Sequence, residues 1–228
     1  MAANVWVAFP TANPPRSRET LAKWRERGYS SIALIDPDQM DLDTGADITV
    51  RHIPYQGYYH AQNYLCRRAL DQGAIAVVCA GDDMDPDPVA DPARVAAECF
   101  ARSGSSLFVM QPCGDTQGRD SSGRSAAERI CGSPWVGPEY IRRGYQGRGP
   151  FCEDYHHQFG DEEAKIVAER NGALWMRGDL TQLHRHWSWG HMPKAPYQVA
   201  AQKFANQDQK TFIARKAAGF PGSGLAPA

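Results

Sequence analysis

The chain has 228 residues, enough for one large domain or two small ones. Its formal net charge of −1 excludes a global basic field that attracts nucleic acid or anionic membranes, but not a local basic patch. The sequence has no apolar run near the ~18 residues of a membrane span, and no charged segment precedes its apolar N-terminal residues. We therefore expect a cytoplasmic protein that makes no membrane contact and keeps its six cysteines as reduced thiols.

Strand and helix patterns alternate over the first 110 residues. The run Ala74–Ala80 is apolar at every position and too short for a helix, which is typical of a strand buried on both faces of a parallel sheet. The predicted strands are 5–9, 31–35, 48–53, 74–80 and 107–110, and the predicted helices are 17–27, 60–72 and 92–103. This order predicts an α/β fold with a mostly parallel central sheet flanked by helices.

The composition changes after residue 110. Residues 114–123 are polar and glycine-rich, and residues 130–159 are dense in Gly, Pro, Arg and aromatic residues, which predicts loops and an irregular wall. The later predicted elements are a helix over 160–171 with Asp161 as N-cap, a strand over 173–176, an amphipathic helix over 195–218 and a frayed tail. We divide the chain into one domain over 1–190, with halves 1–110 and 111–190, and a C-terminal extension over 191–228.

Four carboxylates, Asp82, Asp83, Asp85 and Asp87, follow the buried run at 74–80. Ligands of open α/β sheets bind just beyond the carboxyl ends of the strands. Carboxylates crowded there repel one another unless a cation lies among them, and Mg²⁺ or Mn²⁺ are bound by such oxygens together with substrate phosphates. A solvated acidic turn is the alternative, and the position directly after a buried strand favours a site.

Two histidines near the end of the predicted domain are further candidate ligands. His184 and His186 are two residues apart, so they share one face of an extended segment. Neutral imidazole is a common metal ligand, although such a pair is also ordinary at a surface or in a core. The acidic cluster, which needs a cation, favours the metal interpretation. Asp83, Asp85 and one of the two histidines are the candidate metal ligands.

The ordered set of motifs resembles the GT-A glycosyltransferases, in particular small stand-alone bacterial and phage enzymes of the family-2 type. The base-binding half of their nucleotide site is similar to Pro10-Thr11 and to Asp36 after the second predicted strand. The helix before their metal strand is similar to residues 57–69 with Asn63 and Arg67. Their Asp-x-Asp motif, the acidic motif of inverting members and their late histidine are similar to Gly81-Asp-Asp-Met-Asp85, Phe159-Gly-Asp-Glu-Glu163 and Leu183-His-Arg-His186.

This resemblance implies a metal-dependent transfer of a sugar from a nucleoside diphosphate sugar, first of all a UDP-sugar, to a hydroxyl group with inversion. It places Asp82 at the ribose and Mn²⁺ or Mg²⁺ at Asp83, Asp85 and a histidine. The base is Asp161 or Glu162. We prefer Asp161, although a helix N-terminus lowers the pKa of a carboxyl and weakens it as a base. We expect Arg142 and Arg143, with Arg148, to bind the diphosphate or a phosphate-bearing acceptor.

The acceptor and two other functions remain open. The acceptor is a glycan, a protein or a hydroxymethylated base in phage DNA, the last because the Arg- and aromatic-rich residues 135–155 are suited to phosphates and to an unstacked base. A nucleotidyltransferase shares the layout, but residues 10–15 lack the glycine-rich phosphate loop that it needs. A non-catalytic binding module is the alternative from a different class. The sequence assigns no oligomeric state.

Overall fold

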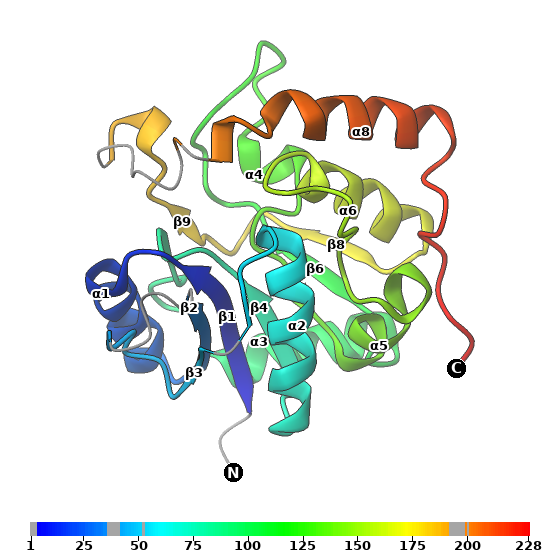
Figure 1. Cartoon of the computed structure of the whole chain (residues 1–228). Helices are drawn as coiled ribbons and strands as arrows, with labels where there is room; N and C mark the ends of the chain where they lie inside the picture. Colours follow the sequence, from blue (N-terminus) through cyan, green and yellow to red (C-terminus); the bar gives the residue numbers. More distant parts are fainter. Residues whose placement is uncertain (1–3, 36–41, 52, 192–198, 200) are drawn as a thin grey trace.

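The computed structural model describes residues 4–35, 42–51, 53–191, 199 and 201–228. A seven-stranded sheet in the order β3-β2-β1-β4-β7-β6-β8 forms its centre (Figure 1). The strands are β1 (Val5–Thr11), β2 (Ser30–Ile35), β3 (Ile48–Val50), β4 (Ala76–Cys79), β6 (Val109–Pro112), β7 (Trp135–Val136) and β8 (Leu174–Arg177). Neighbouring strands are parallel except at β7, which is antiparallel to both β4 and β6. The predicted mixed α/β fold with a mostly parallel central sheet is confirmed.

Helices cover both faces of the sheet, and this explains why its central strands are apolar at consecutive positions. Along β1, Trp6 and Ala8 belong to one core, and Val5, Val7 and Phe9 belong to the other. The first core is completed by α2 (Tyr58–Asp71), α5 (Pro138–Gly147) and α6 (Gly160–Arg170). The second is completed by α1 (Pro14–Glu26) and α3 (Pro92–Ser103). The last helix, α8 (Ala205–Ala217), lies over α6 as a further layer (Figure 1).

Short elements surround the end of the sheet where β1 and β4 finish. They are β5 (Met84–Asp85), β9 (Leu183–His184), α4 (Ala126–Arg129) and the 3₁₀ helix η2 (Trp187–Trp189). β5 and β9 pair antiparallel as a separate two-stranded ribbon, which joins the residues after β4 to the residues after β8. All six cysteines are free; five are buried and Cys113 is half-buried.

The segment 130–159 differs from the irregular wall that its composition predicts. It contains β7, which fills the place between β4 and β6, and the kinked helix α5. The rings of Trp135, Tyr140, Tyr145 and Tyr155 are buried. They are therefore core residues and do not form a stacking surface for a base, which removes the support that these rings gave to a DNA acceptor.

The C-terminal residues also differ from the prediction. The described helix α8 begins at Ala205, while residues 195–198 and 200 of the predicted helix lie outside the described residues. The tail after it is not frayed, because Phe220 and Ser223 are buried and the Ala226 N–H donates to the Arg143 carbonyl oxygen at 2.7 Å. Among the described residues, no helix combines the length and the apolarity needed to cross a bilayer.

Candidate functional site

A cavity of about 760 Å³ lies at the carboxyl ends of β1, β4 and β6. Both halves of the predicted domain line it, with Pro10, Thr11 and Asp83 from the first and Gln111 and Asp161 from the second. Residues just before α8, including Lys203 and Phe204, also line it. The cavity is therefore placed where ligands of open α/β sheets bind.

Asp82 is fixed in the cavity wall by the first strand and the first helix. Its Oδ2 accepts a hydrogen bond from the Thr11 hydroxyl at 2.6 Å, and its Oδ1 accepts one from the Arg16 guanidinium. The Thr20 hydroxyl donates to its backbone carbonyl at 2.7 Å. Burial raises the pKa of Asp82, and the Arg16 charge and the Thr11 hydrogen bond oppose this only in part. Nothing in the sequence singles out Arg16, because its partner lies 66 residues along the chain.

The β5–β9 ribbon brings Asp83 and His184 together from distant parts of the sequence. Met84 pairs with His184 in this ribbon, and the Arg185 N–H donates to the Asp83 carbonyl oxygen at 2.8 Å. As a result, His184 Nε2 lies 3.5 Å from Asp83 Oδ2 inside the cavity. Burial raises the pKa of Asp83, but the hydrogen bond and charge of His184 outweigh it, so the net pKa is lowered.

This pair fits two ligands of one divalent cation. Two ligand atoms that each lie ~2.1 Å from a cation are separated by roughly 3–4 Å, and 3.5 Å falls in that range. Within the described part of the chain, no group of three or more His, Cys, Asp or Glu side chains is arranged to hold a metal ion. A cation bound here therefore needs phosphate or water oxygens to complete its coordination, as Mg²⁺ commonly does.

His186 lies beside this pair in a cluster of rings. Its ring centroid is 4.9 Å from that of His184 and 5.2 Å from that of Trp189, and its Nδ1 lies 2.6 Å from the Ser188 hydroxyl. Burial and the neighbouring His184 lower the pKa of His186 to about 4. One ring nitrogen of His186 is engaged by Ser188, whereas His184 Nε2 lies 3.5 Å from Asp83 Oδ2, so the geometry favours His184 as the ligand.

Asp85 does not lie in the cavity, in contrast to its expected role as a metal ligand. Lys23 Nζ lies 2.8 Å from its Oδ2, and Arg185 Nη2 lies 3.2 Å from its Oδ1. Side chains alternate along a strand, so Met84 faces the cavity while Asp85 faces α1. Two cations already neutralise this carboxylate, so we do not retain it as a metal ligand.

Asp87, the last member of the acidic cluster, has a structural role. Its carboxylate accepts hydrogen bonds from the backbone N–H groups of Val89, Ala90 and Thr181. The cluster is thus two cavity residues followed by two residues that hold the fold together.

Asp161 and Glu162 both line the cavity, at the start of α6. Asp161 is the second residue of the helix rather than its N-cap, which is Phe159. Its Oδ1 accepts from the Glu162 N–H at 3.0 Å and lies 3.4 Å from the Tyr59 hydroxyl. Burial raises the pKa of Asp161 and outweighs the backbone N–H groups at the helix start, which lower it as expected, so the net pKa of this carboxyl is raised. Burial and the Asp161 charge raise the pKa of Glu162.

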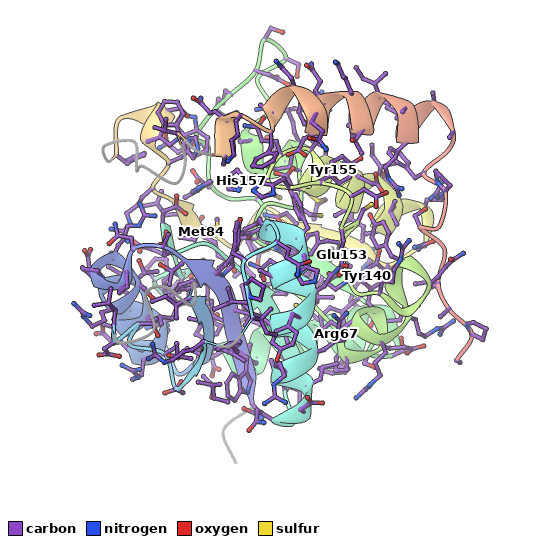
Figure 2. All side chains as sticks on the ribbon, in the orientation of Figure 1. Arg67, Met84, Tyr140, Glu153, Tyr155 and His157 are labelled. Carbon is purple, nitrogen blue, oxygen red and sulfur yellow. The ribbon has the colours of Figure 1, made fainter. Side chains whose placement is uncertain are left out.

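Four residues expected at the nucleotide lie elsewhere. Asn63 is buried, and its side chain exchanges two hydrogen bonds with the backbone of Phe151. Arg67 donates to the Arg148 carbonyl oxygen from the part of α2 remote from His157 (Figure 2). The other two, Arg142 and Arg143, are on α5.

Arg142 is exposed, and Arg143 donates to the Ala226 carbonyl oxygen at 2.8 Å and pairs with Glu139. None of these four side chains lines the cavity, nor does Arg148. Pro10 and Thr11 do line it, and Asp36 lies outside the described residues.

Several cavity residues carry no recognisable signal in the sequence. Asp115, in the predicted loop 114–123, accepts a hydrogen bond from the His184 N–H at 3.2 Å and so fixes this residue from a third segment. Arg129 and Lys203 place two cations on the cavity wall. The loop residues His156 and His157 also line it. Polar residues in loops and on short helices look alike in a sequence, because only the fold determines which of them converge.

Comparisons with known proteins add little to what this geometry indicates about function. No protein-family model matches the sequence, and no curated protein matches it. Among solved structures, the chain is similar to the crystal structure of a glycosyltransferase involved in the glycosylation of the major capsid of PBCV-1. The identity is 7% and the TM-score 0.36, over 61% of this chain and 62% of that one, so this chain spans less than two thirds of its length. A likeness this weak does not support an activity.

Proposed function

We propose that the protein transfers a sugar from a nucleoside diphosphate sugar to a hydroxyl acceptor, with a divalent cation. The observation that supports this most is the pair of Asp83 and His184, 3.5 Å apart, in the same cavity as Asp161. Such a transfer needs two ligands that hold a cation at the diphosphate and a base at the acceptor hydroxyl. Asp83 and His184 are suited to the first role, and Asp161, whose pKa is raised, is suited to the second.

Asp83 and His184 would hold Mn²⁺ or Mg²⁺, with the donor diphosphate supplying further oxygens. When bound, the cation supplies Lewis-acid neutralisation of the charge that develops on the leaving diphosphate. Asp82 contributes the ribose contact in this proposal. Its two oxygens accept from Thr11 and Arg16, and each carboxylate oxygen can accept a second hydrogen bond from a ribose hydroxyl.

Asp161 is the proposed base that takes the proton of the acceptor hydroxyl. Burial raises its pKa, which makes the carboxylate a stronger proton acceptor than an exposed one. Attack from the face opposite the leaving group then inverts the sugar carbon. Glu162 is beside it in the cavity and is the alternative base. The donor we test first is a UDP-sugar, and the acceptor that we retain is a glycan hydroxyl, since the buried rings of 135–155 leave a DNA base without support.

A panel of nucleoside diphosphate sugars, incubated with Mn²⁺ or Mg²⁺ and with glycan acceptors, tests the proposal. We expect cation-dependent hydrolysis of at least one donor and its transfer when the acceptor is right. Absence of hydrolysis, transfer and nucleoside diphosphate binding contradicts the proposal. Release of pyrophosphate from a nucleoside triphosphate indicates a nucleotidyltransferase instead. Ligand binding without a cation and without turnover indicates a binding module.

A further inference from the structure

The loop 156–158 is held by a single carboxylate from the C-terminal helix. Both oxygens of Asp208, which is 1% exposed, accept hydrogen bonds from three successive backbone N–H groups. The donors are His156, His157 and Gln158, each at 2.9 Å. Successive N–H groups that converge in this way form an anion-binding concavity, and here the chain's own carboxylate fills it.

The same loop is held from its other side by the start of α2. The Tyr58 N–H donates to the His156 carbonyl oxygen at 2.7 Å, and the Tyr59 hydroxyl lies 3.3 Å from the His157 carbonyl oxygen. The His156 ring also stacks on Phe204, with centroids 3.8 Å apart. Loops are usually the mobile parts of a fold. This one is fixed from two directions, which is the arrangement expected of a segment that presents a side chain in one position.

The side chain presented is that of His157, which lines the cavity between the N-terminal end of α2 and α8 (Figure 2). Its Nδ1 is buried and has no hydrogen-bond partner among the described residues. Buried polar atoms are nearly always paired, so this imidazole is not placed to stabilise the folded chain alone. The Tyr58 ring, 6.0 Å away by centroids, packs edge-on against it and limits its rotation.

His157 lines the cavity together with groups from both ends of the proposed reaction, Asp83 and Asp161. Its backbone oxygen shares the Tyr59 hydroxyl with Asp161, the proposed base. In a direct transfer, the sugar lies between the diphosphate and the acceptor hydroxyl. A side chain that lines the same cavity as Asp83 and Asp161 is placed to reach this sugar.

We infer that His157 contacts the sugar that is transferred, and that Asp208 is the residue that positions it through the backbone of 156–158. The inference rests on the proposed function and specifies a part of the site that binds neither the diphosphate nor the cation. His157 is the contacting group. Asp208 acts only through the loop, because its carboxylate is occupied by the three N–H groups.

The first test compares His157→Ala and His157→Gln with the wild type and with His60→Ala, a histidine of α2 that does not line the cavity. We expect His157→Ala to lower kcat/KM for the donor about tenfold or more, the equivalent of one lost substrate hydrogen bond. Affinity for the nucleoside diphosphate with Mn²⁺ should stay within about twofold. His157→Gln keeps a donor and an acceptor and should recover part of the loss. His60→Ala should match the wild type.

The second test applies to Asp208. Asp208→Asn places an N–H₂ group against the three backbone donors, so the loop should loosen. We expect faster amide hydrogen exchange confined to 156–158 and its neighbours, and a loss of kcat of up to about 100-fold from misplaced geometry. Asp91→Asn, which alters a carboxylate that accepts two backbone N–H groups at the start of α3, is the matched control and should leave the loop and kcat unchanged.

The outcomes separate this inference from the proposed function. Wild-type protein that turns over no nucleotide sugar contradicts the proposed function. If the wild type is active and His157→Ala is equally active, this inference alone is overturned. It is also overturned if His157→Ala loses as much affinity for the nucleoside diphosphate as it loses in kcat/KM, because this would place His157 at the diphosphate. Unchanged exchange of amides 156–158 in Asp208→Asn overturns the positioning role whether or not a donor has been found.

Discussion

Asp83 meets His184 in the cavity, whereas Asp85 is held outside it by Lys23 and Arg185. We therefore expect Asp83→Ala to abolish transfer and to weaken nucleoside diphosphate binding only when Mn²⁺ is present. Asp85→Asn is the matched control. Its nucleotide binding should still depend on Mn²⁺, and the variant should lose some stability because the side chains of Lys23 and Arg185 lose their charged partner. Calorimetric titrations with Mn²⁺ and with a chelator measure both. Equal weakening by Asp83→Ala in the chelator would show that this carboxylate does not act through a cation.

Asp161 is a second residue whose surroundings determine its chemistry. Burial raises its pKa, and a base acts when ionised, so the transfer rate should rise with pH through a value above the ~3.9 of a free Asp. Asp161→Asn should keep donor binding and lose turnover, and any remaining rate should no longer show this rise with pH.

The same shift predicts the stability of that variant. A carboxyl whose pKa is higher in the folded than in the unfolded chain destabilises the fold as pH rises between the two values. Asp161→Asn should then unfold at the same or a higher temperature than the wild type at neutral pH. Normal turnover in this variant, with loss in Glu162→Gln, would move the base by one residue.

At this scale the sequence predicts contacts within one segment well and contacts between segments poorly. Asp82 and Asp83 were identified because a buried strand directly precedes them, and they line the cavity. Arg142 and Arg143 are residues of the type that binds phosphate. They lie on α5, however, and neither lines the cavity. Asp208 was missed because its partners lie about fifty residues away in the sequence.

At the scale of elements, α8 is joined to α6 by a buried ion pair. The Arg215 guanidinium donates two hydrogen bonds to the fully buried Glu163, at 2.8 and 2.9 Å, and the Tyr155 hydroxyl donates a third at 2.6 Å. Arg215→Ala leaves a buried carboxylate without its charge partner, a change that typically costs about 3–5 kcal/mol. Urea unfolding measures it, and Lys216→Ala, one residue on and exposed, should be nearly neutral. A cost below 1 kcal/mol would mean that α8 docks by its apolar face alone.

The elements that the sequence predicted best are those with local signals. The α3 helix begins at Asp91-Pro92 and ends at Gly104 as expected, because its cap and its stop are encoded in adjacent residues. By contrast, β7 has two residues and is a strand only because β4 and β6 lie on either side of it. A two-residue strand has no periodicity of its own to detect.

At the scale of the whole molecule, the last ten residues pack against the rest of the chain. Phe220 packs against Phe212 of α8, with centroids 6.0 Å apart, and is 5% exposed. Phe220→Ala should therefore destabilise the protein by about 3 kcal/mol, as is common when a buried aromatic ring is removed. Pro221, the next residue, is exposed, so the control variant Pro221→Ala should have little effect on the free energy of unfolding. Equal stability of the two variants would restore the prediction of a frayed tail.

The site also joins distant parts of the chain, since its proposed ligands come after β4 and in β9. Nucleoside diphosphate and Mn²⁺ together should thus raise the unfolding temperature more than the sum of their separate effects. At a hundred times the dissociation constant the stabilisation is about 2.7 kcal/mol, or roughly 5–10 °C for a chain of this length. Differential scanning calorimetry checks this. Purely additive effects would mean that cation and nucleotide bind independently.

The distribution of the thiols offers a practical use. Five of the six cysteines are buried, and Cys66 and Cys79 face each other in the core with their sulfur atoms 3.4 Å apart. Cys113 is the half-buried exception, two residues before Asp115, whose carboxylate holds the His184 backbone. Burial raises the pKa of Cys113, so a maleimide dye should attach to it slowly at neutral pH and faster in mildly alkaline buffer. Cys113 is thus the favoured attachment point for a fluorophore, two residues from a side chain that lines the cavity, where the dye would report filling of that cavity.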